Sequence, residues 1–178
     1  MFFRLALAGT TVALALPLAA QWKDWDYQLD REIKPWAELQ TQLPAYPKDE
    51  NLLRFDMGSA TANRFFIDAR SLSVGEDGVV RYALVIKAAG GATNVTFEGI
   101  RCNGRQVRIY ASGHANGQWS RARNTDWRDI QLREINGYHH TLHRDYFCWT
   151  SNRTETFTLK EIMVNLKRGP QHPADGLR

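Results

Sequence analysis

The pattern of hydrophobic positions is strand-like in the first half of the chain and helical near its end. Residues 65–70 and 79–87 are rich in aromatic and β-branched side chains, and residues 81–84 alternate between polar and apolar. The segment 75–78, Gly-Glu-Asp-Gly, has the composition of a turn. The two runs are therefore predicted to be strands joined as a hairpin.

Further strands are predicted to continue the sheet. Gly99 stands where the apolar positions change face, which indicates a β-bulge. Asn103-Gly104 is the sharpest turn signal in the chain, because Asn-Gly tolerates the positive φ angles of a type I′ turn. The next strand runs over 106–112 and ends before Gly113. Sequential hairpins need no crossover helix, so the pattern predicts an antiparallel meander of four to five strands.

Helical signals follow in the last third of the chain. Residues 138–149 are predicted to form a helix or helical turn that contains Cys148. Thr158 and Glu161 form a capping box, with Phe157 and Ile162 in the positions of a hydrophobic staple. Apolar residues then recur at i, i+3, i+4 and i+7, and two stop signals follow: Leu159, Ile162, Met163 and Leu166, then Gly169 and Pro170. Strands first and helices after predict an α+β fold, with the C-terminal helices packed on one face of the sheet.

The ends of the chain have other patterns. Residues 1–20 have one basic residue, an apolar run and a closing Ala pair, as a cleavable signal peptide does, and no later stretch is long and apolar enough to span a bilayer. Residues 21–50 form a lead-in arm, for which packing on the domain and docking of a partner are both open. Ile33, Trp36 and Leu39 permit a short helix there. Residues 51–170 are the folded domain, and 171–178 are a frayed tail.

Export changes the interpretation of charge and of cysteine. Without the signal the chain has 158 of its 178 residues, with 22 basic and 19 acidic side chains. A net charge of +3 is too small for a nucleic-acid footprint. Cys102 and Cys148 favour a disulfide in an oxidising compartment, with free thiols or a metal pair as the alternatives.

Five segments resemble the CNP1-like family of exported proteobacterial proteins, over about Leu43 to Trp149. They are LPAYPKDENLLRF, NRFFIDARSLSVGEDGVVRYALVIKAAGGATNVTFEGIRC, RIYASG, WSRARNTDWRDI and RDYFCW. Both cysteines lie in these segments, and this supports their pairing. The resemblance implies a bacterial envelope setting. It carries over no activity, cofactor or catalytic residue, because none is assigned to the family.

One polar cluster is the candidate ligand-binding site. Arginine forks suit carboxylates and phosphates, and tryptophan faces suit sugar rings or guanidinium groups. The cluster comprises Trp119, Arg121, Arg123, Trp127 and Arg128, with Arg64 and Asp68 from the first strand as candidates to converge on it. The alternative is a structural loop in which the arginines pair with nearby aspartates and the tryptophans are buried.

Little in the sequence indicates catalysis or a cofactor. His139 and His143 have the i, i+4 spacing of a metal pair, but the sequence offers no evident third ligand, so no metal is predicted. The common hydrolase, metalloprotease and nucleotide-binding motifs are missing from the sequence. Asp68 and His114 are a conceivable acid–base pair. We therefore expect a non-enzymatic periplasmic domain without a cofactor that binds a protein or glycan partner, with a small hydrolase or metal-dependent enzyme as the alternative.

Overall fold

The computed structural model describes residues 35–57, 61–131, 137–149 and 155–170. The predicted signal peptide and the C-terminal tail lie outside these residues. The first elements are η1 (Asp49–Asn51), β1 (Leu52–Phe55), β2 (Arg64–Asp68), β3 (Ser73–Val74), β4 (Val79–Lys87), β5 (Thr93–Arg101) and β6 (Gln106–Gly113). Then follow β7 (Trp119–Arg121), β8 (Arg128–Asp129), α1 (Tyr138–Thr141), η2 (Leu142–Phe147), β9 (Cys148–Trp149), β10 (Glu155–Thr156) and α2 (Leu159–Arg168).

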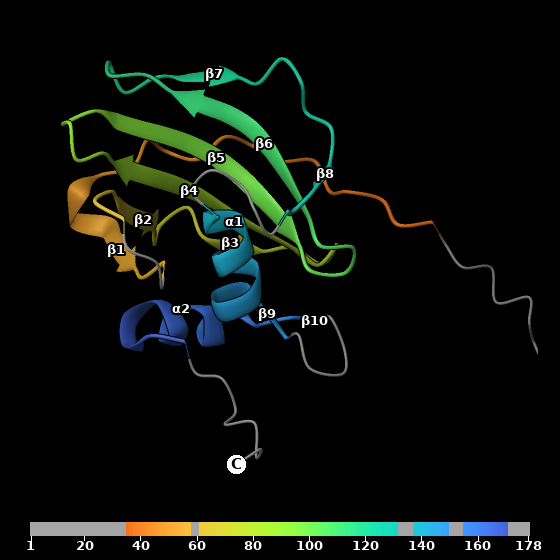
Figure 1. The fold of residues 1–178 in the computed structure, drawn as a ribbon. Coiled ribbons are helices and arrows are strands. Elements are labelled where there is room, and N and C mark those ends of the chain that lie inside the picture. Colours follow the sequence, from red (N-terminus) through yellow and green to blue (C-terminus); the bar gives the residue numbers. More distant parts are fainter. Residues whose placement is uncertain (1–34, 58–60, 132–136, 150–154, 171–178) are drawn as a thin grey trace, which may run out of the picture. The chain divides into compact units, whose positions relative to one another are not determined.

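The sheet is antiparallel, as predicted, but larger than the four to five strands expected. Eight strands form it in the described residues, in the order β1-β2-β4-β5-β6-β7, with β3 on β4 and β8 on β6 (Figure 1). The additional strands are short, of two to four residues. Such segments carry too few alternating positions for a periodic signal. β9 and β10 pair separately.

The central strand β4 is covered on both faces, which explains why Val79 to Val85 are all buried. Successive side chains of a strand point to opposite faces. Arg81 reaches toward the N-terminal residues 36–47, which we call the arm, and donates to the Leu39 carbonyl. Tyr82 packs on Phe147 of η2, with ring centroids 5.1 Å apart. In Figure 1 the arm and the helices lie on opposite sides of the sheet.

The helices enclose the main core, and α2 begins as predicted. Thr158 accepts from the Glu161 amide while the Glu161 carboxylate accepts from the Thr158 amide, so the capping box is confirmed. Ile162 and Leu166 are buried in the core, but Leu159 is 42 % exposed, although its spacing placed it on the apolar face. In the described residues no helix is long and apolar enough to cross a membrane.

The predicted disulfide forms between Cys102 and Cys148, with their Cα atoms 5.6 Å apart. The predicted helix over 138–149 stops earlier than expected. It consists of α1 and η2 and ends at Phe147, and Cys148 has the extended backbone of β9. The disulfide thus joins the turn after β5 to the strand that follows the helical segment.

Three local predictions are corrected by the backbone. The strand predicted over 65–70 ends at Asp68, and the turn at 75–78 joins β3, not β2, to β4. Positive φ angles occur at Gly104 and Arg105, not at Asn103, so the turn after β5 is not type I′. The bulge is not at Gly99 but on the neighbouring strand β6, where Tyr110 is the extra residue opposite the step from Phe97 to Glu98. Gly99 instead permits a close approach, since a Cβ there would lie 2.6 Å from the Tyr110 hydroxyl. The arm is not helical.

Candidate ligand-binding site

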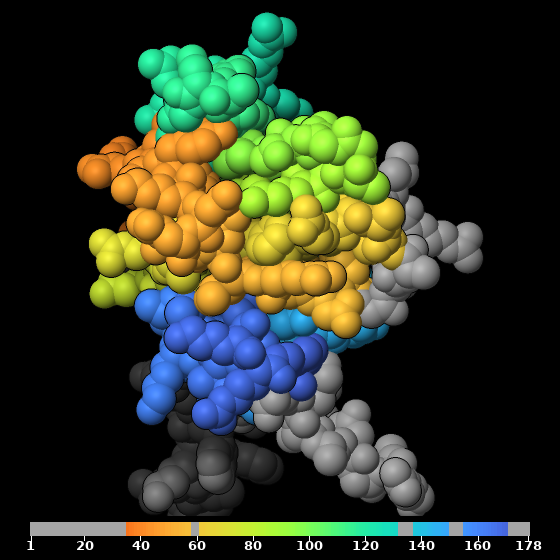
Figure 2. Space-filling model, turned by 90° about the vertical axis from the view of Figure 1, so that its left-hand side faces the viewer, coloured from red at the N-terminus to blue at the C-terminus, as the bar shows by residue number. Residues whose placement is uncertain are grey.

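The arm is held on the sheet mainly by side chains rather than by strand pairing. The Trp36 indole donates to the Asp77 carbonyl at 2.9 Å, and the Trp119 indole donates to the Pro44 carbonyl at 2.9 Å. Further along, the Tyr46 hydroxyl donates to the carbonyl of His114 at 2.8 Å. Figure 2 shows the orange arm and β1 between the teal segment around β7 and the blue α2.

Glu38 is the one acidic residue of the arm, and side chains from distant segments bind it. Its oxygens accept from the Tyr110 hydroxyl at 2.5 Å, from the Trp127 indole at 3.0 Å and from Arg108. Arg81 lies 3.6 Å away as a second cation. Burial first, and the bond to Glu38 next, raise the pKa of Tyr110 above its usual range. The phenol therefore stays a hydrogen-bond donor. The Glu38 carboxylate and the four side chains that surround it, Arg81, Arg108, Tyr110 and Trp127, are called the Glu38 nest.

Asp77 fixes the same part of the arm from the turn before β4. It accepts from the Leu39 amide at 2.8 Å and from Arg81 at 2.6 Å. Burial raises the pKa of Asp77, but the bonds to Arg81, Leu39 and Val79 outweigh it and lower the pKa below the usual value. The Asp77 carboxylate is thus ionised and orients Arg81 toward Glu38.

A cavity of about 440 Å³ opens beside the nest, between the arm and the strands β6 and β7. We call it the arm cavity. Its polar wall combines hydroxyl, amide and guanidinium groups from the arm, β6 and the β7 segment, namely Gln40, Thr41, Arg108, Tyr110, Arg121 and Thr125. Leu39 and Leu43 add apolar surface. Arg108 is paired with Glu38, whereas the Arg121 side chain is exposed and forms no hydrogen bond or ion pair with another described residue.

The predicted cluster is only partly assembled around this cavity. Arg121 lines it, and the indoles of Trp119 and Trp127 are used to hold the arm. Arg123 is exposed and does not line it. Arg128 is exposed on β8, opposite Val107 of β6.

Arg64 and Asp68 lie elsewhere in the sheet. Both belong to β2, and β4, β5 and β6 stand between β2 and β7. Asp68 and His114 are likewise separated, since β4 and β5 stand between β2 and β6. His114 instead contacts the Ser120 hydroxyl, with 2.6 Å between Nε2 and Oγ.

The histidines of α1 and η2 point to different partners. His139 Nε2 lies 2.9 Å from a carboxylate oxygen of the fully buried Glu98, which also accepts from Tyr82 and Thr96. His143 Nε2 lies 3.4 Å from the carbonyl of Cys102. Within the described residues no group of three or more His, Cys, Asp or Glu side chains is placed to hold a metal.

The central residues of the site, Glu38, Arg108 and Tyr110, were not identified from the sequence. Arg108 and Tyr110 carry a usable signal, because polar or polar-tipped side chains recur at alternate positions of β6, on the face that the arm covers. Glu38 carries none, since its partners lie 43 to 89 positions away in the chain.

Comparison with known proteins identifies a family. The model of the CNP1-like family matches residues 31–167, which span the arm, the sheet and nearly all of α2. No curated protein matches the chain, and no solved structure does.

Proposed function

Because this chain belongs to the CNP1-like family, we propose that it is an exported, non-enzymatic binding domain of the bacterial envelope, and that the arm cavity holds a carboxylated glycan. The observation that carries the proposal is Arg121. It is an exposed guanidinium on the wall of a polar cavity, without a partner in the described part of the chain. Guanidinium groups bind carboxylates by two parallel hydrogen bonds.

The rest of the cavity suits a sugar. Thr125 and Gln40 offer hydroxyl and amide groups that donate and accept, as sugar hydroxyls require. The Thr41 hydroxyl donates to the Leu39 carbonyl and can still accept. Leu39 and Leu43 offer apolar surface for the carbon face of a ring. A volume of about 440 Å³ lies in the range of small-ligand sites.

Binding of a protein partner and hydrolysis are the competing functions. Trp36 is 39 % exposed and the Arg101 guanidinium lies 4.2 Å from its ring centroid, a pairing of residue types common in protein interfaces. The His114–Ser120 contact supplies a base and a hydroxyl. Among the described residues no carboxylate contacts the other nitrogen of His114, and a catalytic triad would need one there to orient the base.

The test of the glycan is a calorimetric titration of the exported protein with trigalacturonic acid, and with maltotriose as the neutral trisaccharide. We expect the carboxylated sugar to bind and the neutral one to bind at least tenfold more weakly. Arg121→Ala removes a charged hydrogen bond, and this should weaken binding of trigalacturonic acid by about 10- to 100-fold.

The matched control is Arg123→Ala, which removes an exposed arginine from the same segment but not from the cavity wall. It should leave the affinity within about twofold. Equal binding of both sugars, or equal losses in the two variants, would refute the proposed site. Crosslinking in the living cell that captures one reproducible protein, through Trp36 rather than Arg121, would favour the protein-binding alternative.

Export itself is tested by the mass of the processed chain. Cleavage near Ala20 predicts that the protein isolated from the envelope begins at about Gln21 and is missing the apolar run. An envelope form of full mass would contradict a cleaved signal peptide.

A further inference from the structure

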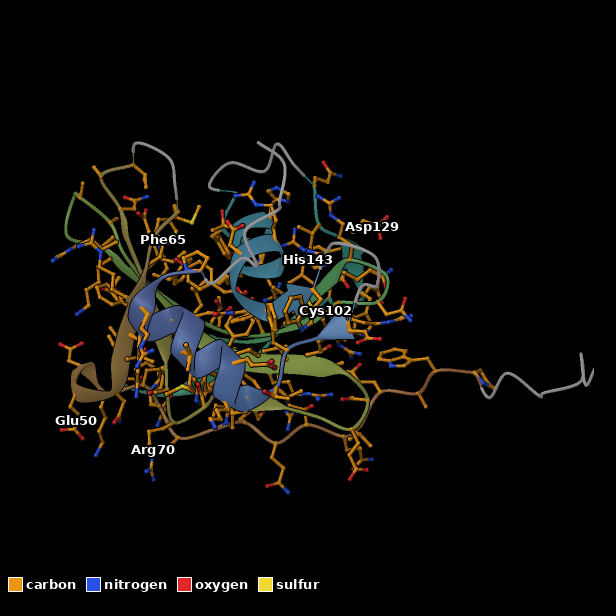
Figure 3. The ribbon with its side chains drawn as sticks, turned by 90° about the horizontal axis from the view of Figure 1, so that it is seen from below. Glu50, Phe65, Arg70, Cys102, Asp129 and His143 are labelled. Carbon is orange, nitrogen blue, oxygen red and sulfur yellow. A yellow bond between two sulfur atoms is a disulfide. The ribbon has the colours of Figure 1, made fainter. Side chains whose placement is uncertain are left out.

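A second cavity lies near the junction of the arm, η1 and the end of β2. Its volume is about 310 Å³. It is lined by Tyr46, Lys48, Glu50, Asn51, Asp68 and Arg70. Figure 3 shows Glu50 and Arg70 at the same corner of the domain, with their side chains directed outward. We call it the Asp68 cavity.

Asp68 differs from the other lining residues because it is only 2 % exposed. Its Oδ2 accepts from the Ser71 amide at 2.9 Å. Its Oδ1 is buried and has no hydrogen-bond partner in the described residues. A buried carboxylate oxygen without a donor costs folding free energy, so most such groups in proteins are paired. On a cavity wall, a group of this kind is a candidate to bind a ligand that supplies the missing donor.

The ligand group that Asp68 selects is an N–H donor with positive charge. A metal ion would need several more oxygen or nitrogen ligands, and the described residues hold no group of three His, Cys, Asp or Glu that provides them. A primary ammonium needs only hydrogen-bond acceptors. The Asp68 carboxylate supplies one, and the charge-assisted bond that forms is stronger than a neutral one.

The exposed part of the cavity adds the opposite charge. Lys48 and Arg70 are exposed cations, and Glu50 is an exposed anion. The formal charges of the four charged lining residues sum to zero, and Asp68 is the one of the four that is buried. This arrangement matches a ligand of no net charge whose ammonium reaches the interior while its carboxylate stays near the two cations.

We propose that the Asp68 cavity binds a free α-amino acid, with the ammonium on Asp68 and the carboxylate toward Lys48 and Arg70. The site lies apart from the arm cavity, and shares no lining residue with it. Its ligand is therefore independent of the glycan proposed there.

The first test uses glycine and betaine, which share a carboxylate but differ in that betaine has no N–H group. In ¹⁵N spectra of the exported protein, glycine should shift the amide signals of Ala69 and Ser71 saturably, and betaine should leave them in place. Acetate carries only the carboxylate of glycine and methylammonium carries only the ammonium, so each should bind at least tenfold more weakly than glycine. Equal shifts by betaine, or shifts by calcium chloride but not by glycine, would overturn the proposal.

The second test separates binding from folding. Asp68→Asn retains an oxygen for the Ser71 amide but removes the buried charge, so the variant should be at least as heat-stable as the wild type without ligand. It should lose at least tenfold in glycine affinity. Asp129→Asn changes an exposed aspartate on β8 and should keep glycine binding. If Asp68→Asn unfolds several degrees lower, or still binds glycine as the wild type does, the carboxylate is not a ligand-binding group.

Discussion

The His139 imidazole and the Glu98 carboxylate meet in the core, 2.9 Å apart, with at most 1 % of either side chain exposed. Glu98 also accepts from the Tyr82 hydroxyl at 2.9 Å and from the Thr96 hydroxyl at 2.7 Å. Burial raises the pKa of Glu98, but the charge and hydrogen bond of His139, and then Thr96 and Tyr82, bring it below its usual value. A carboxylate is thus kept ionised inside the domain.

The first prediction concerns acid stability. The pKa of Glu98 is lower in the folded protein than in the unfolded chain, where it is about 4.3. The ionised Glu98 therefore stabilises the fold fully at a pH above the unfolded-state value. This stabilisation is lost as the pH falls through the folded-state value. At pH 7 Glu98→Gln should cost about 3–5 kcal/mol, because it breaks a buried charged pair. Urea unfolding of the wild type and the variant between pH 7 and 3 should show that the difference between their free energies of unfolding becomes smaller as the pH falls.

The control for this prediction is Glu76→Gln, an exposed glutamate in the turn before β4. Its unfolding should follow that of the wild type at every pH. If the difference in free energy of unfolding between Glu98→Gln and the wild type stays constant down to pH 3, the ionised carboxylate is not what stabilises the core.

The second prediction concerns the arm. Glu38→Ala leaves Arg81 and Arg108 without their shared carboxylate, and should lower the free energy of unfolding by about 2–3 kcal/mol. Trp127 loses an indole partner at the same time, so its fluorescence should change. Glu50→Ala, at an exposed position of η1, should change neither quantity. Equal behaviour of the two variants would show that the nest does not hold the arm.

The third prediction concerns the disulfide. Cys102 and Cys148 close a loop with a sequence separation of 46. Removing the link by Cys102→Ala with Cys148→Ala should cost about 4 kcal/mol, because the unfolded chain regains the entropy of the open loop. Adding reductant to the wild type should lower its urea midpoint, and the double variant should not respond to reductant. A wild-type midpoint that reductant leaves unchanged would contradict this role.

The fourth prediction concerns the start of α2. Thr158→Ala removes the hydroxyl that accepts from the Glu161 amide, and should cost about 1 kcal/mol. Amide hydrogen exchange should quicken in the first turn of α2, where the donor is left free. Thr158→Ser keeps the hydroxyl and should behave as the wild type. Loss of stability in both variants would attribute the effect to packing instead.

The features that the sequence predicted correctly are those set by neighbouring residues. The capping box at Thr158 and Glu161 spans four positions, so its bonding partners are neighbours in the chain. The turn at 75–78 also depends on local residues, and its Gly78 has φ of 74°, although it joins β3 to β4 and not the first predicted strand to β4. Cys102 and Cys148 are distant, but two cysteines allow one intramolecular pairing only.

Contacts between distant segments were decided by the tertiary structure alone. Glu38 meets Arg81, Arg108 and Trp127 only once the arm lies on the sheet, and nothing in its local pattern sets it apart from other surface glutamates. Leu159 has helical spacing yet remains exposed, because the face that α2 buries depends on where the sheet lies. Local order follows from residue type and spacing, whereas the carboxylate nest and both cavities depend on strands and arm packed from remote parts of the chain.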